Sequence, residues 1–154
     1  MTAVIRAARS DELAELHALA LRSKAHWGYD DAFMAACSDE LRVDAALTEA
    51  GRVSLAVAGP QRRVVGFATL EGTPPQGALG MLFIDPDAIG LGIGRLLFRH
   101  ILAQAAESGF ERLTIDSDPH AEPFYLAMGA KRIGSTPSGS IPGRELPLMA
   151  VEVG

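Results

Sequence analysis

Three glycines at every second position are the residues whose spacing most strongly suggests chemistry. Gly90, Gly92 and Gly94 stand after a hydrophobic stretch that ends at Ile84 and before a helical pattern of apolar residues. Glycine tolerates positive φ, so several backbone N–H groups can point toward one place at the start of a helix. Together with the positive end of the helix dipole, such amides form an anion site suited to a pyrophosphate.

The glycine spacing also excludes two common phosphate-binding folds. A dinucleotide-binding fold needs a Gly-x-Gly-x-x-Gly pattern, but the sixth residue counted from Gly90 is Arg95, and from Gly92 it is Leu97. A nucleoside-triphosphatase loop needs Gly-Lys-Ser or Gly-Lys-Thr before its helix, and this segment contains neither. The glycines alone therefore leave two interpretations open, an anion site of another kind and a purely structural turn.

The whole loop resembles a known coenzyme-binding motif. It is similar to the acetyl-CoA loop of the GCN5-related N-acetyltransferase (GNAT) superfamily, whose pattern is hydrophobic-x-Pro-x-x-Gln/Arg-x-x-Gly-x-Gly/Ala. Pro86, Gly92 and Gly94 fall in register with that pattern, and Ile89 stands where the family usually has Gln or Arg. The resemblance implies that backbone amides hold the pyrophosphate, so the departure at Ile89 concerns the side-chain packing of the loop.

A second segment resembles the second cofactor motif of the same superfamily, Asn-x-x-Ala-x-x-Phe-Tyr-x-x-x-Gly-Phe. The matching positions are Ala121, Phe124, Tyr125 and Gly129. Asp118 replaces the family's Asn, and Ala130 replaces its final Phe. Two motifs at compatible spacing are more specific than either alone, and they identify the chain as resembling a GNAT protein.

The resemblance implies where a coenzyme would lie. Backbone groups of the strand before the loop would pair with the pantetheine arm, as though the arm were another strand, and the loop amides would cradle the pyrophosphate. The coenzyme-binding residues implied in this way are Leu82, Phe83, Ile84, Ile89, Gly90, Leu91, Gly92, Ile93, Gly94, Arg95, Asp118, Ala121, Phe124 and Tyr125.

Transfer of an acetyl group from a thioester to an amine needs a proton donor for the departing thiolate. Tyr125 matches the family position for this general acid, and a phenol, with a usual pKa of about 10, stays protonated at neutral pH. A backbone N–H on the strand ending at Ile84 is expected to stabilise the oxyanion. The attacking ammonium must also lose a proton, but that strand carries neither Glu nor His. Glu71, Asp116 and a chain of waters remain the candidates for the base.

Two further segments are candidates for the acceptor pocket. In proteins similar to this one, the aromatic loop between the first two helices and the loop before the final strand lie beside the acceptor. The residues singled out there are His26, Trp27, Tyr29, Ser140 and Arg144. Two alternatives stay open, namely that the aromatic loop only closes the core and that Arg144 is solvated rather than paired with a substrate carboxylate.

Hydrophobic periodicity predicts the elements that must hold these residues. Strands are predicted at residues 4–7, 53–57, 64–70, 78–84, 113–115, 131–133 and 146–153, and helices at 10–23, 30–41, 93–108 and 121–128. This order predicts an α/β (α+β) fold of GNAT type, in which a mixed, mostly antiparallel twisted sheet of about seven strands carries four helices. The resemblance adds that the sheet splays at the acetyl-CoA site. Residues 1–154 contain no linker and no repeat, so a single N-acetyltransferase domain is expected.

Charge and composition limit the partners. The formal net charge is -5 and the basic residues are scattered, which argues against nucleic acid. No apolar run approaches the ~20 residues that span a bilayer, and no signal peptide is evident, so a cytoplasmic protein without a membrane partner is expected. A single cysteine, Cys37, excludes an internal disulfide, and Pro119 interrupts the alternation of Asp116, Asp118 and His120, so no metal is expected. GNAT proteins frequently pair, which makes a homodimer an open expectation.

The sequence therefore predicts an acyltransferase that moves an acetyl group from acetyl-CoA to an amine of a small molecule or peptide. The transfer would be direct, without an acyl-enzyme. The alternative is a non-catalytic acyl-CoA-binding or sensing module, which the missing base on the strand at residues 78–84 favours. The sequence defines neither the acceptor nor the preferred acyl chain.

Overall fold

The structure is a computed structural model that describes residues 2–154. Its strands are β1 (Ala3–Ala7), β2 (Val53–Ala58), β3 (Arg63–Thr73), β4 (Gln76–Ile84), β5 (Arg112–Asp116), β6 (Lys131–Pro137) and β7 (Glu145–Glu152). Its α-helices are α1 (Leu13–Ala25), α2 (Asp31–Cys37), α3 (Ala45–Glu49), α4 (Ile93–Glu107) and α5 (Glu122–Ala127). Short 3-10 turns occur at η1 (Ser10–Glu12), η2 (Asp39–Leu41), η3 (Pro86–Ala88) and η4 (Pro119–Ala121).

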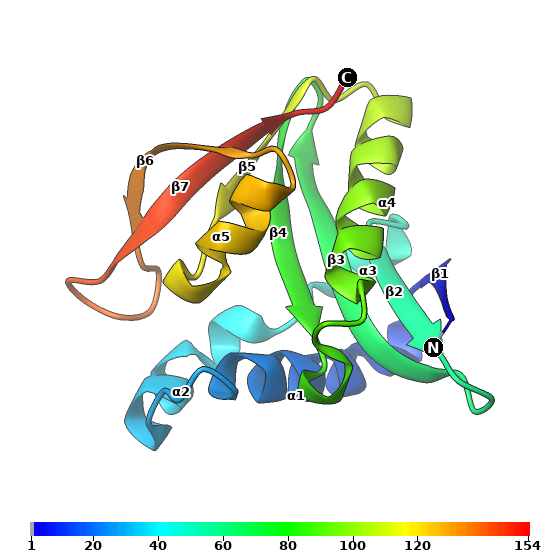
Figure 1. Cartoon of the computed structure of the whole chain (residues 1–154), viewed down its shortest axis with the longest axis horizontal. Coiled ribbons are helices and arrows are strands. Elements are labelled where there is room, and N and C mark those ends of the chain that lie inside the picture. Colours follow the sequence, from blue (N-terminus) through cyan, green and yellow to red (C-terminus); the bar gives the residue numbers. More distant parts are fainter. Residues whose placement is uncertain (1) are drawn as a thin grey trace.

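All seven strands belong to one sheet, in the order β1-β2-β3-β4-β5-β7-β6. Only the β4–β5 pair is parallel among the paired strands of residues 2–154, and the other neighbours are antiparallel. The chain passes from β4 to β5 through α4, which lies against the sheet in Figure 1. The predicted mixed, mostly antiparallel sheet is thus confirmed.

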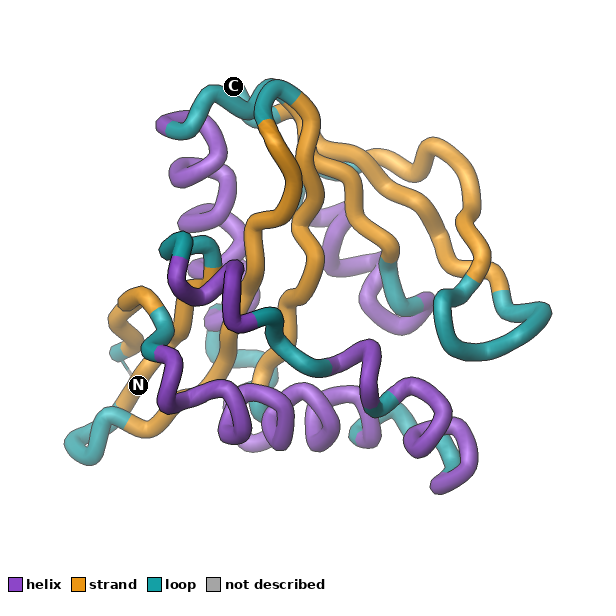
Figure 2. The backbone as a smooth tube through the Cα atoms, turned by 180° about the vertical axis from the view of Figure 1, so that it is seen from behind, coloured by secondary structure: helices purple, strands orange, loops and turns teal. Residues whose placement is uncertain are grey.

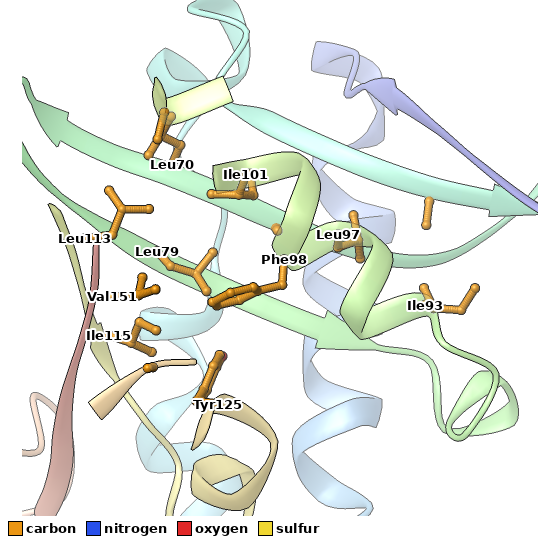
Figure 3. Close-up of a cluster of buried hydrophobic side chains, with 14 of the residues drawn as sticks. Leu70, Leu79, Ile93, Leu97, Phe98, Ile101, Leu113, Ile115, Tyr125 and Val151 are labelled. Carbon is orange, nitrogen blue, oxygen red and sulfur yellow. The ribbon is translucent and has the colours of Figure 1, made fainter. Parts of the chain in front are cut away.

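Helices cover both faces of the sheet, and each face has its own core. On one face, Leu97 and Phe98 of α4 pack with Tyr125 of α5 against the strands, as Figure 3 shows. On the other face, Leu16 of α1 packs with Phe67 of β3, and Figure 2 shows the N-terminal helices on this side. The alternation of side chains along β2 and β3 supplies both cores at once.

The structure corrects the predicted helix count, because the described chain has five α-helices rather than four. The additional helix is α3, which begins after Asp44, whose side chain accepts a hydrogen bond from the Ala46 amide. Five residues are too few to display a 3.6-residue period, so hydrophobic spacing does not reveal this helix. The helix predicted at residues 30–41 is shorter than expected, since α2 ends at Cys37 and η2 follows.

The buried carboxylate of Glu12 joins β1 to the start of α1. Its oxygens accept hydrogen bonds from the two terminal Arg6 nitrogens at 2.7 and 2.8 Å and from the Arg9 amide at 2.8 Å. The Arg6 hydrogen bonds are the largest cause that lowers the pKa of Glu12 to about 2. A lowered pKa in the folded state means that stabilisation is present above the unfolded value, near 4.3, and is lost as the pH falls through about 2.

We therefore expect Glu12→Gln to lower the free energy of unfolding by roughly 2 to 3 kcal/mol at pH 7. The difference from the wild type should shrink between about pH 5 and pH 2, which urea unfolding at several pH values would measure. Glu15→Gln, which removes an exposed carboxylate from the first turn of α1, serves as the control with little expected change. A Glu12→Gln defect that stays constant down to pH 2 would contradict this explanation.

Candidate functional site

β4 and β5 separate after a short pairing, and this separation opens the sheet. Residues 76–78 of β4 pair with residues 112–114 of β5, and the pairing does not continue beyond them. Figure 1 shows the two strands close together at one end and far apart at the other. Because β3 pairs with β4 as far as Ile84, only the β5-facing edge of residues 79–84 lacks a strand partner in the described chain. This is the splay that the resemblance implied.

The opening between the strands is part of a cavity of ≈ 570 Å³. Residues 79–84 of β4 form one wall, and the loop before α4, the end of β5 and α5 form others. The end of α1, η2 and the β6–β7 loop complete it. Of the predicted coenzyme-binding residues, all but Leu91 line this cavity.

The glycine loop presents unused backbone amides to this cavity. Gly90 and Gly92 have φ angles of +85° and +82°, in the left-handed region that favours glycine, and Gly92 is the N-cap of α4. Counting along the chain from Gly90, the first backbone amide with a backbone acceptor is that of Leu96, which donates a hydrogen bond to the Gly92 carbonyl. Within residues 2–154, the amides of residues 90–95 thus have no hydrogen-bond acceptor, and they lie at the positive end of a 15-residue helix. A pyrophosphate fits this arrangement.

Tyr125 contributes a phenol to the same cavity. Its ring lies 6.1 Å from that of Phe98 and 5.2 Å from that of Phe124, measured between ring centroids, and Figure 3 shows it projecting from α5 into the core. Burial raises the pKa of the Tyr125 phenol well above its usual value, and the negative charge of Asp118 raises it further. The phenol is therefore protonated at neutral pH.

Asp118 binds three separate segments together. Its Oδ2 accepts hydrogen bonds from Lys24 at 3.0 Å and from the Tyr29 hydroxyl at 2.9 Å, and Arg144 lies 3.5 Å away. Its Oδ1 accepts a hydrogen bond from the His120 amide at 2.9 Å. Burial alone would favour the neutral acid, but the His120 amide and the Lys24 ammonium outweigh it and hold the pKa of Asp118 well below its usual range. The carboxylate is thus ionised, and its contacts hold α1, the α1–α2 loop and the β6–β7 loop together.

Aromatic rings lie around Asp118. Trp27 stacks on His120 with centroids 5.1 Å apart and planes 6° apart, and Tyr29 stacks on Phe33 at 4.0 Å. The Arg144 guanidinium lies over the Phe33 ring at 4.9 Å and donates a hydrogen bond to the Tyr29 oxygen at 2.9 Å. Burial and the hydrogen bond to Asp118 raise the pKa of Tyr29 to about 12. These contacts hold the α1–α2 loop against the β6–β7 loop.

Only some of the predicted acceptor-site and base residues line the cavity. Trp27, Arg144 and Ser140 line the cavity, and Ser140 donates a hydrogen bond to Glu40 at 2.6 Å. Asp116 also lines the cavity. His26, Tyr29 and Glu71 lie outside its walls, and Glu71 accepts a hydrogen bond from Thr69 at 3.0 Å.

Sequence reasoning missed several residues that line the cavity. Lys24 and Cys37 come from the ends of α1 and α2, and Met81 comes from β4. Each lies in an ordinary apolar or helical pattern that carries no functional signal of its own. His120 was predicted only as part of a rejected metal cluster, yet the Asp-x-His spacing with Asp118 is a signal that points to a paired imidazole.

Comparison with protein families identifies the chain. The family model described as the acetyltransferase (GNAT) domain matches residues 14–139. The chain belongs to the GNAT acetyltransferase family. This GNAT chain is also similar to the peptidyl-lysine N-acetyltransferase YjaB of Salmonella typhimurium, with 35% identity over 89 residues. The match covers 58% of this chain and 57% of YjaB, so it spans little more than half of that relative.

Solved structures share the GNAT fold over nearly the whole chain. A GCN5-related N-acetyltransferase from Rhodopseudomonas palustris superposes with a TM-score of 0.79 at 23% identity, covering 99% of this chain and 96% of the other. The PaiA N-acetyltransferase of Thermoplasma acidophilum, in complex with coenzyme A, superposes with a TM-score of 0.78 at 17% identity and covers 99% of each chain. At these identities the likeness concerns the fold.

The part of the chain that the structure describes lacks two features. Residues 2–154 contain no group of three or more His, Cys, Asp or Glu side chains placed to hold a metal ion. Among the described helices, none combines the length and the apolar character that a membrane crossing requires.

Proposed function

We propose that this GNAT protein, as one domain of residues 1–154, transfers an acetyl group from acetyl-CoA directly to an amine of a small molecule or peptide. One observation carries the proposal: Tyr125 and the glycine loop line the same cavity, and the loop amides of residues 90–95 have no hydrogen-bond acceptor in the described chain. The amides suit the diphosphate of the donor, and the phenol suits its leaving thiolate.

The fit of the coenzyme is supported by backbone chemistry. The pyrophosphate would accept hydrogen bonds from the loop amides, and the exposed Arg95 at the cavity wall would add positive charge. The unpaired edge of residues 79–84 would hydrogen-bond to the amides of the pantetheine arm. Ile89, which replaces the family's Gln or Arg, is exposed, so the replacement leaves the amides available.

The chemistry then needs few side chains. The lone pair of the neutral amine attacks the thioester carbonyl carbon, and a β4 amide stabilises the oxyanion. As the C–S bond breaks, the Tyr125 phenol gives its proton to the sulfur and regains one from the nitrogen of the intermediate. The reaction yields an N-acetyl product and the free thiol, and positioning of the amine beside the thioester contributes much of the rate.

The acceptor side of the cavity supports an amine with an apolar portion. Met81, Leu146 and Trp27 supply apolar surface, while Glu40 near the β6–β7 loop supplies a carboxylate for a cationic group. The YjaB relative is named for peptidyl-lysine, an acceptor of this chemistry. A lysine side chain in a peptide is therefore the first acceptor to test.

Calorimetry and a turnover assay test the proposal together. We expect the folded protein to bind CoA and acetyl-CoA, and to release free thiol from acetyl-CoA when a terminally blocked lysine peptide, spermidine or an amino-acid panel is added. Binding without thiol release for any of these amines would favour the non-catalytic acyl-CoA-binding module. Absence of any CoA binding by the folded chain would exclude both functions.

A further inference from the structure

One ring nitrogen of His120, Nδ1, is hydrogen-bonded, and the other, Nε2, has no hydrogen-bond partner in the described chain. Its Nδ1 lies 2.9 Å from the Asp118 Oδ1 and 3.1 Å from the Tyr29 oxygen. An ionised carboxylate only accepts hydrogen bonds, so the proton of the neutral ring belongs on Nδ1. Nε2 then carries a lone pair, and no residue of the described chain donates a hydrogen bond to it. Stacking on Trp27 fixes the plane of the ring.

The position of this ring suits proton transfer at the acceptor. His120 lines the same cavity as Tyr125, and so do its neighbours Asp118 and Trp27. The charged and titratable groups around the ring are Asp118 on its own turn, Lys24 and Tyr29 from the α1 side, and Arg144 from the β6–β7 loop. All four are engaged with one another, which leaves Nε2 as the group of this cluster with a free lone pair.

We propose that His120 is the general base of the reaction and that Asp118 and Tyr29 position it; this inference rests on the proposed function. Nε2 accepts a proton from the acceptor ammonium, so one N–H bond breaks and an Nε2–H bond forms. The freed nitrogen lone pair attacks the thioester carbonyl, while Tyr125 protonates the departing sulfur. The imidazolium then gives its proton to solvent, which accounts for the one proton that the overall reaction releases.

The cavity contains one competing carboxylate. Asp116 is exposed at the end of β5 and lines the cavity, but no hydrogen bond within residues 2–154 orients its side chain. Glu71, the other candidate from the sequence, lies outside the walls and accepts a hydrogen bond from Thr69. Orientation by Asp118, Tyr29 and Trp27 is what distinguishes His120 from both.

The test is a pH comparison of His120→Asn with the wild type. Asparagine retains an N–H that can donate to Asp118 but lacks a basic lone pair. With acetyl-CoA and a terminally blocked lysine peptide, we expect kcat/KM of the variant to fall by roughly a hundredfold or more at pH 7. At pH 10 the difference in kcat/KM between His120→Asn and the wild type should narrow to about threefold. A lysine amine has a pKa near 10.4, so a larger fraction of the peptide is already deprotonated at this pH.

Controls separate this inference from the proposed function. His100→Asn, an exposed histidine of α4 outside the cavity, should match the wild type at both pH values, and calorimetry should give the same CoA affinity for all three proteins. A His120→Asn defect equal at pH 7 and pH 10, or no defect, would overturn the assignment. The assignment would also be overturned if Asp116→Asn showed a pH-dependent loss of kcat/KM and His120→Asn did not. A wild type that binds CoA but releases no thiol would instead overturn the proposed function, and the base with it.

Discussion

A Tyr125→Phe variant is expected to bind coenzyme as tightly as the wild type and to lose about a thousandfold in kcat. In the proposed mechanism, removal of the phenol would leave the thiolate without a proton donor, whereas the pyrophosphate and pantetheine contacts would involve backbone groups elsewhere. The raised pKa of the phenol means that it is protonated throughout the neutral and mildly alkaline range. Single-turnover thiol release and calorimetry with CoA would measure the two quantities separately.

Stability is not expected to change in this variant. The phenylalanine ring would keep its contacts with Phe98 and Phe124, and within residues 2–154 the Tyr125 hydroxyl makes no hydrogen bond that the variant would lose. The melting temperature should therefore stay within about 2 °C of the wild-type value. A variant with normal kcat would show that the phenol only packs the core, and a parallel loss of CoA affinity would point to a binding role.

The second large effect is expected from Gly92→Ala, with a loss of about a hundredfold in affinity for CoA. A non-glycine residue at a φ of +82° costs roughly 1 to 2 kcal/mol. Any relaxation of the loop also weakens the charge-assisted hydrogen bonds that its amides would give to the pyrophosphate, each contributing roughly 1.5 to 3 kcal/mol. The strain itself is present in the free protein and lowers stability, whereas a loss of about 2.8 kcal/mol from these hydrogen bonds corresponds to a hundredfold change in the dissociation constant.

Gly59 offers a matched control for this substitution. Its φ is +79°, and an added Cβ would meet no atom within 4 Å, as at Gly92. Gly59 lies in the turn between β2 and β3, and it is not part of the cavity wall. Both alanine variants should lose similar unfolding free energy in urea, but only Gly92→Ala should lose CoA affinity. Equal CoA affinities in the two variants would mean that the glycine loop does not hold the coenzyme.

The local sequence pattern was enough to predict the strand, loop and helix whose backbone groups line the proposed coenzyme site. The strand ending at Ile84, the glycine loop and the helix that follows are continuous in sequence, so their periodicity and spacing define the loop–helix junction. The structure confirms those elements, and it places the predicted coenzyme-binding residues, with the exception of Leu91, at one cavity.

Side-chain contacts between distant segments were not predictable in the same way. Lys24 and Asp118 are 94 residues apart and meet at 3.0 Å only because α1 crosses the open end of the sheet. The replacement of the family's Asn by Asp at position 118 appeared in the sequence as a departure from a motif. In the structure it provides a charge that two cations share, and no single segment contains that information.

Under the proposed function, binding of the acyl donor along the unpaired edge of β4 would also stabilise the folded chain. Backbone groups of residues 79–84 that face β5 have no strand partner in the described chain, so an extended molecule such as the pantetheine arm could hydrogen-bond to them. A molecule that binds the folded but not the unfolded chain raises the free energy of unfolding by about 2.7 kcal/mol at a hundred times its dissociation constant. If the chain binds acetyl-CoA as proposed, its resistance to heat and to proteases should rise with the concentration of acetyl-CoA.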